Sequence, residues 1–194
     1  MTQETRVTAA MIVIGDEILS GRTKDVNIGA VADFCTDLGI DLTEVRVVSD
    51  EMDAIVEAVN ALRQRYTYVF PSGGIGPTHD DITADAIATA FGVALPINAQ
   101  ARDMLEARWK QTGTEVNEAR LRMARIPEGA DLIVNSVSAA PGFRIGNVHV
   151  MAGVPVIMRA MLEALAPILK GGKKVKSVTV KAAVGEGTVG GPLA

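Results

Sequence analysis

The chain has 194 residues, of which 48% are hydrophobic, and this is enough apolar material for one core of ordinary domain size. The formal net charge is −4 and no run of Lys or Arg exceeds the pair Lys173-Lys174, so we expect no nucleic-acid partner. A single cysteine excludes an internal disulfide framework and a Cys-rich zinc module. No apolar run approaches the ~18 residues that a membrane span needs, so we expect a cytoplasmic protein without membrane contact.

The first elements predicted are a strand and a helix. Residues 7–14 form a near-continuous apolar run, which is typical of a strand buried on both faces of a parallel sheet, and the run ends at Gly15. Asn27 can cap the helix that follows, and Gly39 is placed to end it. Cys35 lies on the apolar face of this helix, so we expect it to pack in the core.

The next two units repeat this order of strand and helix. Residues 40–48 alternate and are rich in Val and Thr, which predicts a second strand that ends before Asp50. A helix is expected over about residues 53–66, and a third strand at 68–70 runs into a glycine-rich loop. The helix after this loop stops at Gly92. Three successive β-to-α units predict a three-layer α/β/α fold with a mainly parallel sheet.

The rest of the main domain is predicted to contain a helical insertion, two strands and a last helix. We expect the insertion over residues 98–125, the strands at 132–135 and 148–151, and the helix at about 156–169. The segment Ala140-Pro141-Gly142-Phe143 is typical of a turn. His149 falls in a predicted buried strand, which favours a structural role.

The composition changes after Gly171-Gly172. Residues 173–184 alternate like a strand, and the last residues are rich in glycine. We therefore divide the chain into a main domain at residues 1–172 and the start of a truncated accessory unit at residues 173–194.

A glycine-rich loop after the third strand is the first candidate site. It reads Ser72-Gly73-Gly74-Ile75-Gly76-Pro77-Thr78-His79-Asp80-Asp81. Glycines lack Cβ atoms, so the backbone can turn tightly and bring its N–H groups up to a phosphate, and the next helix adds the positive end of its dipole. The loop lacks a Walker Lys and does not read GxGxxG, so it predicts an anion cradle of another kind. The alternative is that the glycines serve tight packing alone.

Acidic residues follow each of the first three strands. They are Asp16, Glu17, Asp50, Glu51, Asp80 and Asp81. These carboxylates would repel the anion that the glycines attract, and a divalent metal (Mg²⁺, Mn²⁺ or Co²⁺) resolves the conflict because it binds carboxylates and phosphates together. Asp16, Asp50 and Asp81 end three different strands at one edge of the sheet, so they are the predicted metal ligands and catalytic acids. The alternative is that these acids cap helices or lie in solvent.

Several motifs occur in an order that is specific. They are Ile14-Gly15-Asp16-Glu17-Ile18-Leu19-Ser20-Gly21 with Asn27, Ser49-Asp50, the glycine loop through Thr83, Asn117, Ile126-Pro127-Glu128-Gly129-Ala130, Ala140-Pro141-Gly142-Phe143 and Gly153-Val154-Pro155. Over about residues 8–170 the chain resembles the molybdenum-cofactor-biosynthesis fold family, which includes MoaB- and MogA-like proteins. Within it, the chain is most similar to the N-terminal domain of competence- and damage-inducible protein A (CinA).

The resemblance implies a domain that binds molybdopterin or a related nucleotide, with the glycine loop around its phosphate. It implies that Asp50 and Asp81 handle the pterin. It also implies a ligand-binding surface made of Gly15, Glu17, Asn27, Ser72, Gly73, Gly74, Gly76, Pro77, Thr78, Asp80, Gly142, Gly153 and Pro155. Family members usually associate, so we expect a homo-oligomer, either a dimer or a trimer.

The resemblance leaves three functions open. The first is a binding module for a phosphorylated pterin or nucleotide. The second is a metal-dependent nucleotide pyrophosphatase, because similar CinA-type domains are linked to cleavage of ADP-ribose or FAD. The third is a regulatory relative without catalysis, suggested by the departure at Ile157, where a Glu is usual. The sequence also departs from the family pattern at Ala139 and Ala152. These departures predict a different outer wall of the pocket.

Overall fold

The computed structural model describes residues 6–174, 183–185, 188 and 191. Most of the predicted accessory unit at 173–194, with its strand at 173–184, lies outside the described residues, so the division of the chain at residue 172 stays a prediction. Within the described ranges, no helix has both the length and the apolar character that crossing a bilayer requires.

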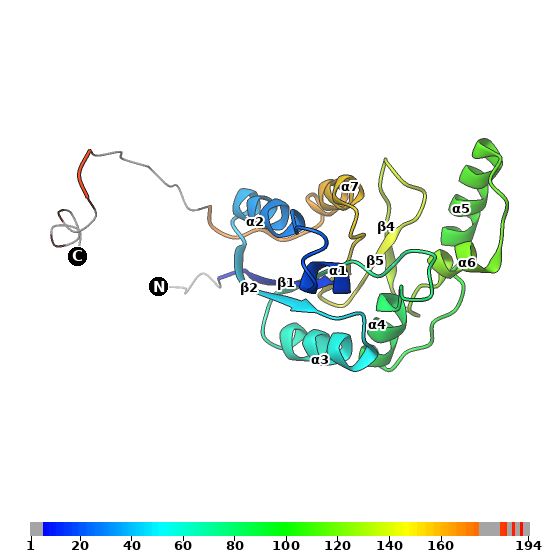
Figure 1. The fold of residues 1–194 in the computed structure, drawn as a ribbon, viewed down its shortest axis with the longest axis horizontal. Coiled ribbons are helices and arrows are strands. Elements are labelled where there is room, and N and C mark those ends of the chain that lie inside the picture. Colours follow the sequence, from blue (N-terminus) through cyan, green and yellow to red (C-terminus); the bar gives the residue numbers. More distant parts are fainter. Residues whose placement is uncertain (1–5, 175–182, 186–187, 189–190, 192–194) are drawn as a thin grey trace.

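The centre of the fold is one six-stranded sheet (Figure 1). In spatial order its strands are β2 (Asp41–Val48), β1 (Thr8–Ile14), β3 (Tyr68–Ser72), β6 (Val148–Val150), β5 (Gly142–Ile145) and β4 (Asp131–Ile133). Strands β2, β1, β3 and β6 pair in parallel, and β5 pairs antiparallel with both of its neighbours. The prediction of a mainly parallel sheet is therefore confirmed.

Helices cover both faces of this sheet, as Figure 1 shows. Helices α2 (Asn27–Leu38) and α7 (Pro155–Leu165) lie on one face, and α3 (Met52–Arg63) and α4 (Thr83–Phe91) lie on the other. Successive residues of β1 alternate between the two cores, with Met11 on the side of α2 and α7 and Ile12 on the side of α3. This alternation explains the continuous apolar run, and the three-layer α/β/α architecture is as predicted.

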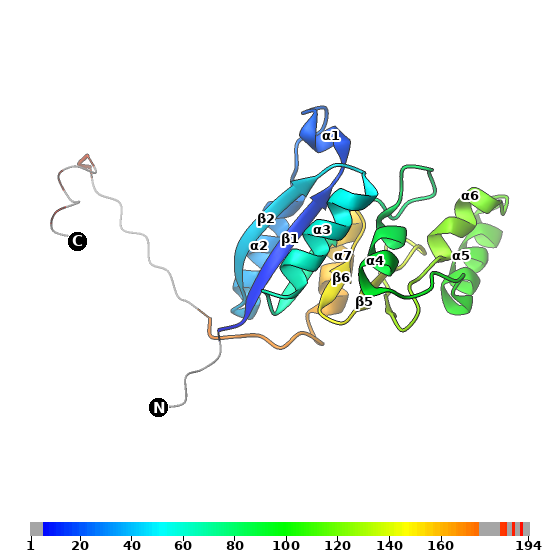
Figure 2. The ribbon, with the colours of Figure 1, turned by 90° about the horizontal axis from the view of Figure 1, so that it is seen from below.

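The predicted helical insertion lies at the end of the molecule opposite β2 (Figure 2). It consists of α5 (Ala99–Thr112), α6 (Glu118–Leu121) and the 3₁₀ turn η1 (Arg122–Ala124). The side chains of Asn98 and Asn117 cap the two α-helices, and Gly113 ends α5 with a left-handed φ of 67°. Trp109 packs α5 against the core on the α3 side.

Some boundaries and one predicted turn differ from the predictions. The helix expected at 156–169 is α7, which ends at Leu165, and the strand expected at 132–135 is the shorter β4. The predicted turn at Ala140–Phe143 is wrong, because Gly142 and Phe143 begin β5. A Cβ atom at Gly142 would lie 2.3 Å from the carbonyl oxygen of Val150, so this glycine serves close packing of β5 on β6.

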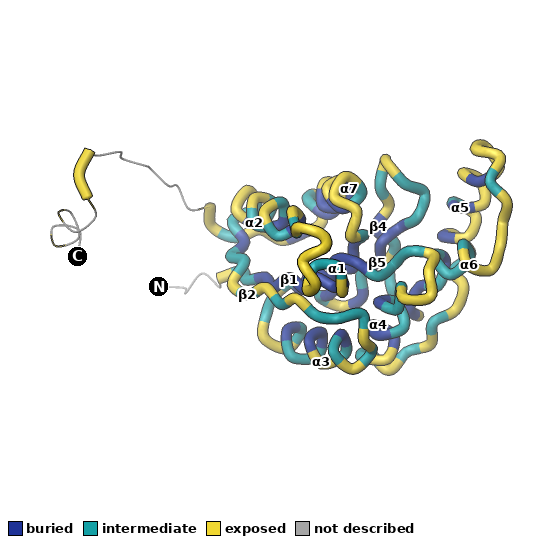
Figure 3. Tube along the Cα trace, viewed as in Figure 1, coloured by how far each residue is buried: buried dark blue, intermediate teal, exposed yellow. Residues whose placement is uncertain are grey.

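The short helix α1 (Asp16–Leu19) directly after β1 was also not predicted. Its four residues begin within the acidic motif that follows the first strand. Figure 3 shows the burial along the chain, with β1 buried and α1 exposed in part. All three residues of β6 are buried as well. The most deeply buried strands are therefore those that run toward the loops described below.

The predicted burial of Cys35 and of His149 is confirmed. Cys35 is fully buried, and burial raises the pKa of its thiol to about 12. His149 is only 3% exposed and packs edge-on against Tyr68, with ring centroids 5.6 Å apart. Burial lowers the pKa of His149 to about 4, so the imidazole is neutral in the folded protein at neutral pH.

His149 should make the folded state lose stability in mild acid. Between pH 6.5, the ordinary pKa, and pH 4 the unfolded chain binds a proton at His149 that the folded chain excludes. The free energy of unfolding should fall across this window by up to roughly 3 kcal/mol. Urea unfolding at several pH values measures the fall, and His149→Gln should reduce it. An equally steep fall in the variant would contradict the prediction.

Candidate functional site

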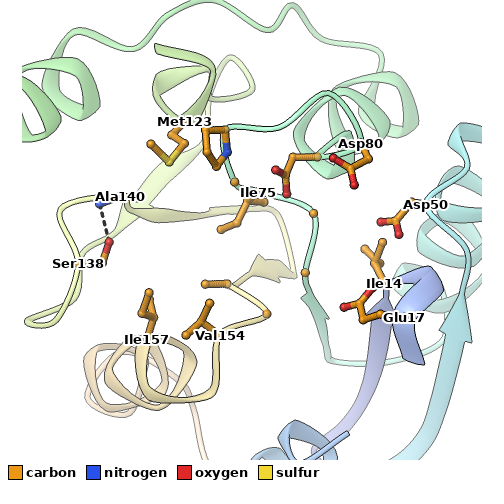
Figure 4. Close-up of a pocket in the computed structure, with 17 residues that line it drawn as sticks. Ile14, Glu17, Asp50, Ile75, Asp80, Met123, Ser138, Ala140, Val154 and Ile157 are labelled. Atoms are coloured by element: carbon orange, nitrogen blue, oxygen red, sulfur yellow. Dashed lines mark hydrogen bonds between the residues drawn. The ribbon is translucent and has the colours of Figure 1, made fainter. Parts of the chain in front are cut away.

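A cavity of about 510 Å³ opens at the carboxyl ends of β1 and β3 (Figure 4). The glycine loop runs through its centre, with acidic side chains on one side and apolar side chains on the other. It is lined by Ile14, Glu17, Asp50, Gly73, Gly74, Ile75, Gly76, Pro77, Asp80, Asp81, Met123, Ser138, Ala140, Ala152, Gly153, Val154 and Ile157. This is the edge of a parallel sheet at which ligands are expected to bind.

The glycines of the loop are required by close contacts. A Cβ atom at Gly73, where φ is +112°, would lie 2.3 Å from the carbonyl oxygen of Ile14. At Gly74, where φ is +64°, it would lie 2.3 Å from Thr83 Oγ1. At Gly76 it would lie 2.6 Å from a carboxylate oxygen of Asp81. The predicted alternative, tight packing, therefore accounts for part of the glycine content.

Hydrogen bonds from the start of α4 and from within the loop hold it in place. The hydroxyl of Thr83 donates to the carbonyl oxygen of Gly73 (2.9 Å), and the N–H of Thr83 donates to that of Gly74 (3.0 Å). The N–H and the hydroxyl of Thr78 both donate to Asp81 Oδ2, the former at 2.8 Å. The carboxylate of Asp81 therefore shapes the loop.

Three backbone donors of the loop are left free by these bonds. Among the described residues, no acceptor receives a hydrogen bond from the N–H of Gly74, Ile75 or Gly76. All three residues line the cavity, and α4 begins a few residues later. Successive free N–H groups before a helix N-terminus form an arrangement that suits an anion.

The acidic side of the cavity carries four carboxylates, and no basic side chain is among its described lining residues. Asp50 Oδ2 accepts the N–H of Asp16 at 2.9 Å. Burial raises the pKa of Asp50, and the negative charges of Asp16, Glu17 and Asp80 raise it further, against the effect of that hydrogen bond. Asp50 thus binds a proton more readily than an ordinary aspartate.

The apolar side of the cavity was missed by sequence reasoning. Its main side chains are Ile75, Met123 from η1, and Val154 and Ile157 from the start of α7. Ser138 also lines it, and its hydroxyl accepts the N–H of Ala140 at 3.1 Å (Figure 4). The sequence signals for this wall were the departures at Ala152 and Ile157. Met123 and Ser138 come from segments that only the folded chain brings to the loop.

The predicted site residues fall into two groups. Those that line the cavity are Glu17, Asp50, Gly73, Gly74, Gly76, Pro77, Asp80, Asp81 and Gly153. Those outside its lining are Gly15, Asp16, Asn27, Ser72, Thr78, Gly142 and Pro155. Asn27 illustrates the second group, because it is buried and its Nδ2 donates to the carbonyl oxygen of Gly153 at 2.8 Å. In this structure Asn27 braces the wall of the cavity.

The three aspartates that the sequence predicts as metal ligands do not form one cluster in this structure. Within the described ranges, no three His, Cys, Asp or Glu side chains are grouped so that they could hold a metal ion. Asp16 lies outside the cavity lining, and Asp81 accepts the hydrogen bonds of Thr78. The carboxyl ends of neighbouring strands bring these residues near one edge of the sheet. Their carboxylates do not converge on one point there.

Comparisons with known proteins agree with this architecture. The sequence profile of a family described as a probable molybdopterin binding domain matches residues 10–171. The crystal structure of CinA from Thermoplasma acidophilum, a protein described as of unknown function, is 34% identical and superimposes with a TM-score of 0.75. That likeness covers 84% of this chain and 98% of the other. MoaB from Pyrococcus furiosus, described as tungsten cofactor synthesizing, is 18% identical with a TM-score of 0.56 over 84% of this chain and 92% of its own, which shows the shared fold alone.

Curated relatives are longer than the matched region. A protein of Caldivirga maquilingensis is 36% identical over 166 residues, which are 84% of this chain and 65% of that protein. A protein of Saccharolobus islandicus is 37% identical over 160 residues, which are 80% of this chain and 61% of that protein. The chain thus spans less than two thirds of the length of these relatives.

Replacement of Gly73 by Ala should strongly destabilise the fold. The new Cβ would meet the carbonyl oxygen of Ile14 in a left-handed backbone conformation, so we expect a loss of about 2–5 kcal/mol in the free energy of unfolding. Gly29 in α2 has no atom within 4 Å of the corresponding position, and Gly29→Ala should be neutral or stabilising by up to about 1 kcal/mol. Urea unfolding compares the two, and equal midpoints for Gly73→Ala and wild type would refute the packing argument.

Proposed function

Because the chain belongs to the family of probable molybdopterin binding domains, we propose that its cavity binds a phosphorylated pterin of the molybdopterin type, with the phosphate on the glycine loop. The observation that carries this proposal is the row of free N–H groups at Gly74, Ile75 and Gly76, all of which line the cavity. Hydrogen bonds from backbone N–H groups to an ionised acceptor are among the stronger ones in proteins. The N-terminus of α4 adds its dipole to the same position.

The apolar side of the cavity suits the ring system of such a ligand. Met123, Val154 and Ile157 offer apolar surface across the loop from the carboxylates. A flat heterocycle gains by leaving water for such a surface, and its polar edge can reach Ser138 or backbone groups. The division of the cavity into an apolar and a polar side thus matches a molecule with a ring at one end and a phosphate at the other.

The acidic side requires a cation if the ligand is an anion. Four carboxylates would repel the phosphate, and the lining provides no basic side chain among the described residues. Asp50, together with Glu17 or Asp80, would hold a divalent metal, with the phosphate of the ligand as a further group that binds it. The metal would neutralise the negative charges that meet there. A pair of carboxylates plus a phosphate fits this donor set better than the three-aspartate centre.

A metal-dependent nucleotide pyrophosphatase is the second candidate function. The specific observation in its favour is the raised pKa of Asp50 beside the anion cradle. A carboxylate of raised pKa is a better base, so in this function Asp50, left unbound by the metal, would take a proton from a water molecule that attacks the pyrophosphate, and Glu17 or Asp80 would hold the metal. The N–H groups of the loop would stabilise the negative charge that develops on the phosphorus oxygens. If no turnover occurs, the protein binds its ligand without cleaving it.

Ligand binding should depend on the phosphate and on a divalent metal. Isothermal titration should show that neopterin monophosphate binds at least about tenfold more tightly than neopterin with Mg²⁺ present, because only the former offers charged acceptors to the loop. EDTA should remove most of this difference. Asp50→Asn keeps an acceptor for the N–H of Asp16 and should lose the response to Mg²⁺, whereas Asp103→Asn on the exposed face of α5 should retain it. Equal affinities for the two pterins would refute the proposal.

Hydrolysis of ADP-ribose or FAD tests the second function. With Mg²⁺, Mn²⁺ or Co²⁺, turnover by the wild type should fall about 100-fold or more in Asp50→Asn, the loss typical of a removed general base. The rate should also decline on acidification at a pH above the ordinary aspartate pKa of 3.8, because Asp50 is protonated more readily. Equal turnover in wild type and Asp50→Asn would exclude this role of Asp50. Tight binding without turnover would leave the binding function.

A further inference from the structure

Arg122 lines a second, much smaller cavity that borders the glycine segment. This cavity shares Gly74, Ile75 and Gly76 with the large one and has a volume of about 20 Å³. A space of this size holds a single water molecule. The glycine segment therefore borders both the ligand cavity and a pocket that contains an arginine.

The guanidinium group of Arg122 contacts the loop directly. Its Nη2 donates to the carbonyl oxygen of Asp81 at 3.3 Å. Its Nε is buried and has no hydrogen-bond partner among the described residues. A buried N–H without a partner is unfavourable, and one water in the small cavity would satisfy it while reaching the backbone of the loop. Arg122 thus has one direct connection to the loop and the means for a second.

The positive charge of Arg122 is not neutralised by a carboxylate. Two acids also line the small cavity, and both already have partners. Asp85 pairs with Arg125, with Nη1 and Oδ2 3.2 Å apart, and Asp81 accepts the N–H of Thr78 at 2.8 Å. Within the described ranges, no Asp or Glu lies within ion-pair distance of Arg122. Its charge is therefore available to the loop.

We infer that Arg122 is a positioning residue for the glycine loop, holding it through the backbone at Asp81 and supplying a positive charge that the described lining of the ligand cavity lacks. This inference rests on the proposed function only for its effect on ligand binding. In the protein without ligand, the hydrogen bond from Arg122 to the carbonyl oxygen of Asp81 should slow hydrogen exchange in the loop. The guanidinium group of Arg122 does not line the ligand cavity, and its positive charge favours an anion bound on the loop.

Hydrogen exchange in the protein without ligand tests the positioning role. The hydrogen-bonded amides of Gly73, Thr78 and Asp81 should exchange about fivefold faster in Arg122→Met than in wild type, the change expected for the loss of one hydrogen bond. Peptides from β1 and α2 should be unchanged, which separates this effect from general unfolding. Arg120→Met is the matched control, because Arg120 donates to the carbonyl oxygen of Glu115 and does not line either cavity. Equal exchange in wild type and Arg122→Met would overturn the inference.

Titration with the two pterins tests the charge. Arg122→Met should weaken the binding of neopterin monophosphate about tenfold and leave that of neopterin unchanged. Arg122→Lys keeps the charge and should retain part of the preference for the phosphorylated ligand. An equal loss for both ligands would assign Arg122 a merely structural role. If wild type prefers neither ligand, the proposed function fails, and the exchange experiment still decides the role of Arg122 in the loop.

Discussion

The site depends on the absence of a side chain at Gly73. At this residue the end of β3 passes against the carbonyl oxygen of Ile14 at the end of β1, where a Cβ atom would lie 2.3 Å away. On its other side the N–H of Gly73 donates to the carbonyl oxygen of Met151 (3.1 Å), and Gly153 also approaches the Gly73 backbone. Three chain segments thus meet through backbone atoms, and the cavity opens where they part. A larger residue at Gly73 would force these segments apart.

The buried polar residues next to this contact serve the same arrangement. Asn27 at the start of α2 reaches the carbonyl oxygen of Gly153, and the hydroxyl of Ser72 donates to that of Ala152 at 3.2 Å. Both side chains are almost fully buried, so their hydrogen bonds act in a medium where a lost partner is costly. They fix the wall of the cavity, although neither residue lines it. Asn27 and Ser72 belong to the family motifs, and their role in this structure is to hold the cavity wall in place by hydrogen bonds.

Periodicity and backbone chemistry made much of this fold predictable. The run at residues 7–14 predicted a doubly buried strand because both faces of β1 meet a core, and the glycine loop was found because its conformation excludes side chains. Strand β5 was not found, because Pro141-Gly142 has the local pattern of a turn while packing against Val150 decides its conformation. Met123 and Arg122 were missed for a related reason. Their positions depend on how η1 folds back onto the loop, which no local pattern records.

Binding and cleavage make nearly the same demands on this site. Either function needs the free N–H groups of Gly74, Ile75 and Gly76 for a phosphate, and either needs positive charge to offset four carboxylates. Asp50 is held by the N–H of Asp16 and made more basic by burial and by its acidic neighbours, which suits a metal ligand as well as a base. The acidic side therefore does not distinguish the two functions. The difference lies in whether a water molecule can stand beside Asp50 while the ring of the ligand occupies the apolar side at Met123 and Ile157.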